Sequence, residues 1–275
     1  MNRPHRLIDK DRPLIERFLR DKMDVYVFVA ERLLKHPSEE SIALAILDGD
    51  SISSMLYLSG NVVPISLSPD TAEIFTKTAY VKYAQIASIV GIDQDVNCFW
   101  KALSVSDESR SIQNLRAYQP YMVLDETREL PSNPTLRYIE LYDFEQYFDA
   151  SYSMFIGEVG RAPINLDNYK SRLYEQIMKK RCIGYFDEYG TLRFKVDIPI
   201  CYENVCQVQG VWLHPEWRGK AKSSALFAEA ISVIQRDIAP RITLYVNDFN
   251  IPALKLYQSL GFKEIARYST IFLDL

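Results

Sequence analysis

The sequence predicts a mixed α/β fold, of α+β type with a mixed sheet, divided into two domains. The chain has 275 residues, more than a single domain usually contains, and its 48% hydrophobic residues supply enough apolar material for two cores. In each half, short apolar runs typical of strands alternate with segments of helical periodicity. The polar, proline-bearing segment 125–134 is the best linker candidate, so we expect one domain at 1–130 and another at 131–275.

The first half is expected to begin with two helices. Residues 11–19 repeat apolar side chains at four-residue spacing, and residues 25–35 open like a strand but place their apolar residues on one helical face, which favours a helix. The turn Asp48-Gly49-Asp50 is typical of a hairpin. The expected strands lie at 42–47, 51–58, 61–67, 86–90 and 121–124, and the further helices begin at 68 and span 93–103.

The second half is expected to follow the order β-α-α-β-β-β-α-β-α-β. The first half has nearly the same order, α-α-β-β-β-α-β-α-β, which indicates a degenerate duplication without residue-level repetition. Asp143 is expected to cap the first helix and Gly261 to end the last. The expected strands lie at 136–141, 182–186, 192–198, 205–213 and 241–246, and residues 262–273 are expected to form a terminal hairpin or strand. The expected helices lie at 143–157, 168–180, 219–236 and 252–260.

Charge and composition argue against several classes of protein. The formal net charge of −4 and the pI near 5.5 argue against a nucleic-acid partner, because such proteins carry basic surfaces. The N-terminus lacks the apolar run of a signal peptide, and no stretch approaches the roughly 20 apolar residues that span a membrane. We therefore expect a cytoplasmic protein without a membrane partner.

The cysteines and histidines lack the spacing of a metal site. The four cysteines form no CxxC pair and the three histidines are scattered along the chain. We expect no metal, and we interpret Cys98, Cys182, Cys201 and Cys206 as buried thiols in a reducing cytosol.

A basic, glycine-bearing turn between a predicted strand and a predicted helix is the strongest local signal. Arg218, Lys220 and Lys222 place three cations within five residues, and Gly219 permits a conformation that brings backbone close to a ligand. Cations beside a helix N-terminus oppose the helix dipole unless an anion is present. This arrangement therefore predicts a phosphate or diphosphate site, with a solvated basic first turn as the alternative.

Two sequence motifs carry a family resemblance. Residues 211–220, VWLHPEWRGK, resemble the acetyl-CoA-binding motif of the GCN5-related N-acetyltransferase (GNAT) superfamily, and residues 247–262, NDFNIPALKLYQSLGF, resemble the strand–helix motif that follows it. Both motifs in the right order are more specific than either alone. The resemblance extends to two-domain actinobacterial members with an N-terminal domain of unknown function, on the segments 27–32, 60–64, 206–212 and 244–247. It implies tandem acyl-CoA N-acyltransferase-like domains, of which the N-terminal one is degenerate.

The resemblance implies acetyl-CoA as co-substrate and assigns roles by position. The backbone of Val211 and Leu213 would align the pantetheine arm and the acetyl carbonyl. Backbone amides of residues 218–223 would bind the diphosphate, and Asn250 would hydrogen-bond the cofactor arm. The implied cofactor-binding residues are Val211, Trp212, Leu213, Arg218, Gly219, Lys220, Ala221, Lys222, Ser223, Asn250, Ala253 and Tyr257.

Tyr257 is the predicted acid, which would protonate the departing thiolate. A phenol with an ordinary pKa near 10 stays neutral at pH 7 and can donate its proton. The sequence has 18 tyrosines, and only the position of Tyr257 between Asn250 and Gly261 distinguishes it. The alternative is an aromatic residue that packs under its helix.

The motifs depart from the family pattern at two places. Ala221 and Ser223 stand where small residues, most often glycine, are usual, and a left-handed Ala221 would cost roughly 1–2 kcal/mol, or about tenfold in affinity. The strand 205–213 carries Gln207 and Gln209 where many relatives have a carboxylate that acts as general base.

The missing base leaves several candidates open. A water relay could end at Glu158, at Glu203 or at Asp197, and each of these carboxylates has a surface role as its alternative. We place Glu158, in the turn bounded by Gly157 and Gly160, and Gln207 beside Tyr257 in the predicted catalytic group.

These predictions favour an enzyme that transfers an acetyl or similar acyl group directly from acetyl-CoA to a primary amine. The alternative is a degenerate, non-catalytic CoA-binding or structural module. Aminoacyl transfer by tandem domains is a third hypothesis, against which the predicted diphosphate loop argues. Residues 61–74 have the strand-to-helix order without a basic glycine turn, so we expect the first domain not to bind CoA.

Overall fold

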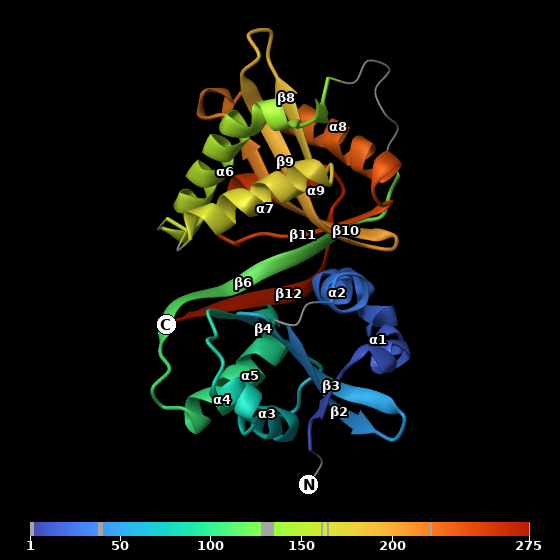
Figure 1. Cartoon of the computed structure of the whole chain (residues 1–275). Coiled ribbons are helices and arrows are strands. Elements are labelled where there is room, and N and C mark those ends of the chain that lie inside the picture. The colour runs from blue at the N-terminus through green and yellow to red at the C-terminus, as the bar shows by residue number, and fades with distance from the viewer. Residues whose placement is uncertain are drawn as a thin grey trace. The chain divides into compact units, whose positions relative to one another are not determined.

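The computed structural model describes residues 3–37, 41–127, 135–160, 162–163, 165–220 and 222–274 (Figure 1). Contacts divide the chain into two compact units. The first comprises Met1–Met122, Tyr245–Leu254 and Glu264–Leu275, and the second comprises Val123–Leu244 and Lys255–Lys263. Ala221 and residues 128–134 of the predicted linker lie outside the described residues.

The first unit begins with helices and continues with a hairpin, as the sequence predicts. The ambiguous run 25–35 forms a helix, as favoured, but with a kink at Tyr26, whose φ of −117° and ψ of 24° are not helical. The main elements are β1 (His5–Arg6), α1 (Arg12–Leu19), α2 (Met23–Ala30), β2 (Ile42–Asp48), β3 (Ser51–Leu58), β4 (Asn61–Ile65), α3 (Pro69–Thr76), α4 (Ala79–Lys82), β5 (Ser88–Ile92), α5 (Asp93–Ser106) and β6 (Ile112–Leu124). Short 3-10 turns at Asp9–Asp11 and Arg20–Lys22 and a π-helical turn at Glu31–Lys35 connect the first helices.

The strands of the first unit form a mixed sheet in the order β1-β2-β3-β4-β5-β12-β6. Strands β1 to β4 pair antiparallel, whereas β4 and β5 are parallel. The C-terminal strand β12 (Lys263–Leu273) pairs antiparallel with β5, with Tyr268 opposite Ile92. The last segment of the chain therefore completes the first sheet.

The second unit repeats this plan. Its elements are β7 (Arg137–Tyr138), α6 (Phe144–Val159), α7 (Leu166–Met178), β8 (Cys182–Phe186), β9 (Leu192–Tyr202), β10 (Val205–Leu213), α8 (Lys222–Asp237) and β11 (Arg241–Tyr245), with 3-10 turns at Leu141–Asp143 and Pro215–Trp217; the helix α9 (Ile251–Ser259) follows. The strand order is β7-β8-β9-β10-β11, antiparallel up to β10 and parallel between β10 and β11.

The two units thus share one order of elements and one pattern of strand pairing. Each has a strand, two helices, three antiparallel strands, a helical crossover and a parallel strand. This confirms the predicted mixed α/β fold and the duplicated element order.

Each unit has its own apolar core. In the first, Phe75 and Phe99 pack with aliphatic residues of β2 to β5 and β12. In the second, Phe144 and Tyr147 of α6 and Ile177 of α7 pack against β8, β9 and the side chain of Trp212, so α6 and α7 cover one face of that sheet (Figure 1).

Two expectations about single elements differ from the structure. The extended piece 121–124 is the end of the 13-residue strand β6, whose first half is too polar to read as a strand. Asp143 does not cap α6 through its side chain. Its carboxylate instead accepts hydrogen bonds from both terminal nitrogens of Arg137, at 2.7 and 2.9 Å, and from the amide of Glu140 at 2.9 Å.

Candidate active site

The strands β10 and β11 separate halfway along their length. They pair in parallel over Val205, Cys206 and Gln207, whereas β10 continues to pair with β9 as far as Leu213. Among the described residues, the ladder between β10 and β11 ends at Gln207. The backbone of the second half of β10 can therefore serve as the open edge on which an extended ligand forms strand-like hydrogen bonds.

Strand β10 is irregular where it leaves its neighbour. Its register against β9 shifts between Gln207 and Gln209 and again between Gln209 and Trp212. Between them Gly210 has a φ of 59°, a left-handed conformation that favours glycine. The bulge bends the strand and sets the direction of the backbone of Val211.

The predicted anion loop follows β10 and leads into α8. Gly219 has a φ of 73°, as the turn requires. Within the turn, the amide of Arg218 donates to the carbonyl of Pro215 at 3.2 Å, and that of Lys220 donates to the carbonyl of Trp217 at 3.4 Å. The amides of Lys222 and Ser223 lie in the first turn of α8, where a helix offers no acceptor of its own. They remain candidates for a ligand, while those of Arg218 and Lys220 stabilise the turn.

Trp217 lies beside one cation of this loop, Lys222, a contact that sequence reasoning missed. The ammonium of Lys222 lies 5.7 Å from the centre of the indole ring, and the ring of Tyr185 lies 5.5 Å from it. Arg218 donates through Nε to the carbonyl of Leu213 at 3.1 Å. Arg218, Lys220 and Lys222 are all exposed, so their charges are available to a bound anion.

A second arginine fixes the approach to the loop. Arg193 Nε donates to Asp187 at 2.6 Å, and its Nη1 donates to Glu216 at 3.0 Å. It thereby ties the turn between β8 and β9 to the residues that precede Trp217. Backbone amides, chiefly that of Thr191, and the guanidinium of Arg193 hold the pKa of Asp187 below its usual value.

The predicted backbone ligands on β10 differ in the direction of their side chains. Trp212 is buried in the core of the second unit, whereas Val211 and Leu213 are half-buried. Gln207 is buried, and its Oε1 accepts a hydrogen bond from Gln209 Nε2 at 3.0 Å. The side chain of Gln207 is thus a buried hydrogen-bond acceptor on β10. Its catalytic role remains a prediction.

Tyr257 lies on α9 in an aromatic cluster, with its ring 5.5 Å from that of Phe227 and 5.8 Å from that of Phe262. It is 8% exposed. Burial, and then the charge of Glu158, raises its pKa above the ordinary value of 10. The phenol therefore keeps its proton at neutral pH, as the predicted acid must. The same Coulomb interaction shows that Glu158, exposed near the end of α6, is electrostatically coupled to Tyr257.

Asn250 and Ala253 belong to the beginning of α9. Asn250 Oδ1 accepts from the amide of Ala253 at 3.3 Å, and its carbonyl accepts from the amide of Leu254 at 3.0 Å. Asn250 is therefore the N-cap of the helix that carries Tyr257. The segment Tyr245–Leu254, which includes both residues, belongs to the first unit. The loop 218–220, Lys222, Ser223, Glu158 and Tyr257 all lie in the second unit.

The first unit has the same strand–turn–helix arrangement, but two backbone amides of its turn donate hydrogen bonds to a carboxylate of the same unit. After β4, the amides of Ser66 and Leu67 donate to the two oxygens of Asp95 at 3.0 and 2.7 Å. Tyr26 donates to the same carboxylate at 3.4 Å, and Lys22 donates to Ser66 Oγ at 2.7 Å. Asp95 is 6% exposed. In the turn that corresponds to the diphosphate loop, the carboxylate of Asp95 thus occupies the place that an anionic ligand would take.

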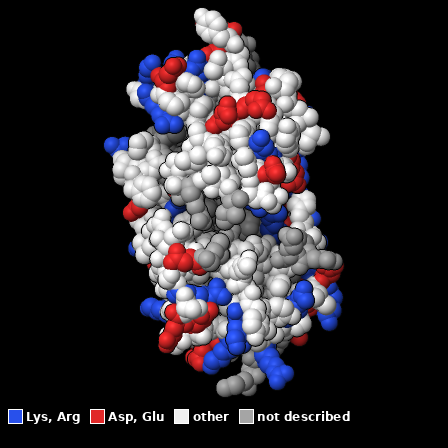
Figure 2. Space-filling model, turned by 60° about the vertical axis from the view of Figure 1, so that its left-hand side comes forward, with Lys and Arg blue, Asp and Glu red and all other residues white. Residues whose placement is uncertain are grey.

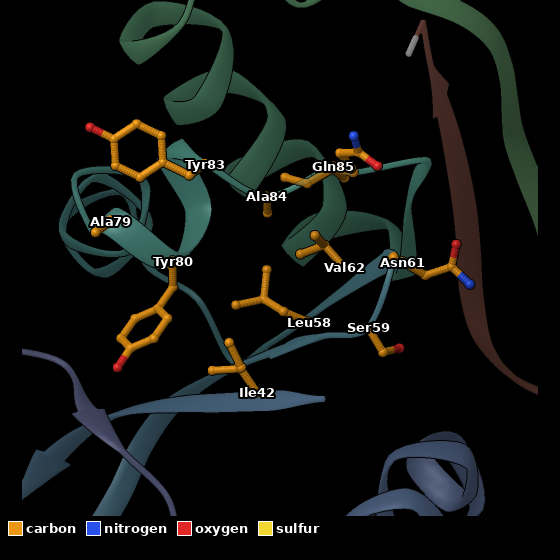
Figure 3. A pocket seen from close by; sticks show the side chains of 12 residues that line it. Ile42, Leu58, Ser59, Asn61, Val62, Ala79, Tyr80, Tyr83, Ala84 and Gln85 are labelled. Atoms are coloured by element: carbon orange, nitrogen blue, oxygen red, sulfur yellow. The ribbon is translucent and has the colours of Figure 1, made fainter. Parts of the chain in front are cut away.

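A cavity of about 390 Å³ lies elsewhere in the first unit, at the beginning of β4. Figure 3 shows Ile42, Leu58, Val62 and Ala84 around a common space, with Tyr80 and Tyr83 at its margin. The lining mixes apolar side chains with Ser59, Asn61 and Gln85 and contains no Lys or Arg, so the cavity does not suit a diphosphate.

Charge is mixed on one face of the molecule. Lys and Arg side chains are interspersed with Asp and Glu on the face that Figure 2 shows. The part of the chain that the structure describes contains no group of three metal-ligating side chains, and none of its helices has both the length and the apolarity needed to cross a bilayer.

Comparisons with known proteins agree with this geometry. Residues 167–262 match the model of the acetyltransferase (GNAT) family, and residues 43–147 match that of a domain of unknown function, DUF4081. A search of the curated proteins gave no match.

Several solved structures share the fold over nearly the whole chain. A Drosophila protein is 13% identical with a TM-score of 0.68, and the match covers 99% of both chains. A GCN5-related N-acetyltransferase from Sphaerobacter thermophilus is 15% identical with a TM-score of 0.63, over 98% of this chain and 94% of that one. A tandem GNAT protein from the clavulanic acid biosynthesis pathway is 11% identical with a TM-score of 0.60, over 98% and 97%. At these identities the likeness shows the fold alone.

The fold and the family match define a chain of two GNAT-like domains. More specifically, the chain carries a C-terminal domain of the GNAT acetyltransferase family behind an N-terminal DUF4081 domain.

Proposed function

We propose that the protein transfers an acetyl or similar acyl group from acetyl-CoA to a primary amine. The observation that carries this proposal is the open edge of β10 beyond Gln207, which leads directly into the basic turn before α8. An extended pantetheine arm fits the first feature, and a diphosphate fits the second.

The amine attacks the thioester carbonyl without a covalent enzyme intermediate. Backbone groups of Val211 and Leu213 align the arm and the carbonyl, while the first turn of α8 and the cations of the loop bind the diphosphate. Tyr257 donates its proton to the departing thiolate. The phenol is neutral at pH 7, so it carries the proton that the thiolate needs when the sulfur leaves.

CoA binds only to the second unit in this proposal. The amides of Ser66 and Leu67 already have a carboxylate partner, so the first unit offers no free anion site at its equivalent turn. The competing hypothesis is a non-catalytic module that has lost its ligand.

Calorimetric titration with acetyl-CoA separates the two hypotheses. We expect saturable binding by the full chain, and weaker binding by the double variant Lys220→Glu/Lys222→Glu. Each reversal removes an attraction of about 1 kcal/mol and adds a repulsion of similar size, about 4 kcal/mol in all, so the affinity should fall roughly 1,000-fold. The loss should shrink at high salt, because exposed charges are screened.

The matched control is Lys179→Glu/Lys180→Glu, which reverses two exposed lysines at the end of α7 in the same unit. It should bind acetyl-CoA like the wild type. No heat of binding with millimolar acetyl-CoA would exclude the enzyme hypothesis, and equal losses in both double variants would exclude the loop as the diphosphate site.

A further inference from the structure

A buried ion pair stands next to the irregular part of β10. Lys195 and Asp197 lie two residues apart on β9, so their side chains share one face of the sheet. The ammonium of Lys195 donates to Asp197 Oδ2, and the hydroxyl of Tyr147, on α6, donates to Asp197 Oδ1 at 3.1 Å. The side chain of Lys195 is fully buried, whereas that of Asp197 is 14% exposed. The carboxylate is therefore the member of the pair that solvent or a substrate can reach.

Gly210 brings this carboxylate against the backbone of β10. A Cβ atom on Gly210 would lie 3.0 Å from Lys195 Nζ and closer still to Asp197 Oδ2. Only glycine leaves room for the ion pair, and its φ of 59° is also left-handed. Asp197 thus lies against Gly210, the residue that precedes Val211 on β10.

The groups around Asp197 come from four elements. They are Lys195 on its own strand, Tyr147 on α6, Cys182 on β8 and Tyr169 on α7. Burial raises the pKa of Asp197 above its ordinary value of 3.8, while Lys195 and Tyr147 lower it. Burial, followed by the charges of Asp197 and Glu158, raises the pKa of Tyr169 to about 12. The charge of Glu158 also raises the pKa of Tyr257, after the larger effect of burial.

We propose that Asp197 accepts the proton of the acceptor amine, and that Lys195 and Tyr147 are positioning residues that orient its carboxylate. This inference rests on the proposed acyl transfer. Asp197 takes one proton from the bound ammonium, and the freed lone pair forms the N–C bond. The C–S bond then breaks, its electron pair stays on sulfur, and Tyr257 protonates the thiolate. The second amine proton restores Tyr257 through solvent, and Asp197 releases its proton, so that one proton is liberated per turnover.

The geometry favours Asp197 over the other carboxylates that the sequence left open. Glu203 lies in the turn between β9 and β10, and six residues of strand separate the beginning of β10 from Val211, a distance of about 20 Å. Glu158 is exposed near the end of α6 and acts on the acid Tyr257. Asp197 lies against the bulge of β10, where a Cβ on Gly210 would meet its carboxylate.

The test combines a pH profile with a direct titration. CoA release from acetyl-CoA is followed with a thiol reagent and a panel of primary amines: ethylamine, benzylamine, spermidine and a tripeptide with a free amino group. We expect Asp197→Asn to lose at least 100-fold in kcat while retaining its affinity for acetyl-CoA. Lys195→Met removes a cation that favours the ionised carboxylate, so the acidic limb of its kcat profile should move to higher pH. Tyr147→Phe should move it in the same direction by less, and Lys179→Met should leave it unchanged.

Carbon-13 NMR of labelled aspartate supplies a readout that needs no acceptor. The Asp197 signal, assigned by its loss in Asp197→Asn, should titrate above pH 3.8, and at still higher pH in Lys195→Met. An Asp197 signal whose titration is the same in Lys195→Met, or a kcat profile of Asp197→Asn like that of the wild type, overturns the inference. Calorimetry with acetyl-CoA tests the proposed function separately. If the protein binds acetyl-CoA and either of these two results is found, the role of Asp197 as the base is refuted and the proposed function is not.

Discussion

Tyr257→Phe is expected to lower kcat about 100- to 10,000-fold, the range by which removal of a general acid slows an enzyme. The affinity for acetyl-CoA should stay within a factor of about two to three of the wild type. The phenol lies among Phe227 and Phe262, and phenylalanine preserves these ring contacts. Only the hydroxyl is lost, so the substitution separates proton donation from packing. The measurement is CoA release with the amine panel, together with calorimetry.

Tyr174→Phe is the matched control for this variant. Tyr174 is 44% exposed, and its ring stacks on Phe144 at 3.8 Å, away from the aromatic cluster of α9. It should keep full activity. If Tyr257→Phe instead lost affinity and turnover equally, or unfolded at a much lower urea concentration, Tyr257 would be a packing residue and the acid would have to be sought elsewhere.

The fold could be predicted from the sequence because its elements are marked locally. Period-two apolar runs, the hairpin turn at Gly49 and the apolar stripe of α8 each depend on neighbours in the chain. The boundaries of β10 are those predicted, Val205–Leu213. The polar first half of β6 lacks such a pattern, and pairing within the sheet, not local preference, makes it a strand.

The path of the last strand could not be predicted for a different reason. Nothing local in residues 263–273 says that this strand pairs with β5, more than 170 positions earlier. Repeat order alone would place β12 with the strands of its own half. The pairing of β12 with β5 depends on contacts between residues far apart in the sequence, and the composition of a single strand does not specify its partner.

Some residues of the candidate site could be predicted from short motifs, and others could not because their roles depend on residues far away in the sequence. The basic turn and the N-cap Asn250 are visible as short motifs, since each role depends on residues within a few positions. The ion pair of Lys195 and Asp197 carries no such signal, because its significance depends on Gly210 in the next strand. The role of Asp95 is equally hidden, since the amides that it binds lie 28 and 29 positions earlier.

Asp95→Ala is expected to destabilise the protein by about 2–4 kcal/mol, because it leaves buried amide donors unsatisfied. The amides of Ser66 and Leu67 would lose their acceptor, as would the hydroxyl of Tyr26. Burial, the largest influence, raises the pKa of Asp95, and the two amides lower it. Burial disfavours the ionised carboxylate, and the hydrogen bonds that it accepts from the two amides of the turn compensate for this cost. The measurement is the urea midpoint, interpreted as a free energy only where the transition is two-state.

Asp93→Ala tests whether any aspartate in the same helical turn would have this effect. Asp93 Oδ1 accepts from Asn97 at 2.8 Å on the exposed side of α5, so its loss should cost less than about 1 kcal/mol. Added acetate should raise the urea midpoint of Asp95→Ala more than that of the wild type, because a free carboxylate can occupy the vacated turn. Equal stability of the two alanine variants would mean that the turn does not depend on Asp95. In that case its closure would no longer support our proposal that only the second unit, built on the same plan, binds CoA.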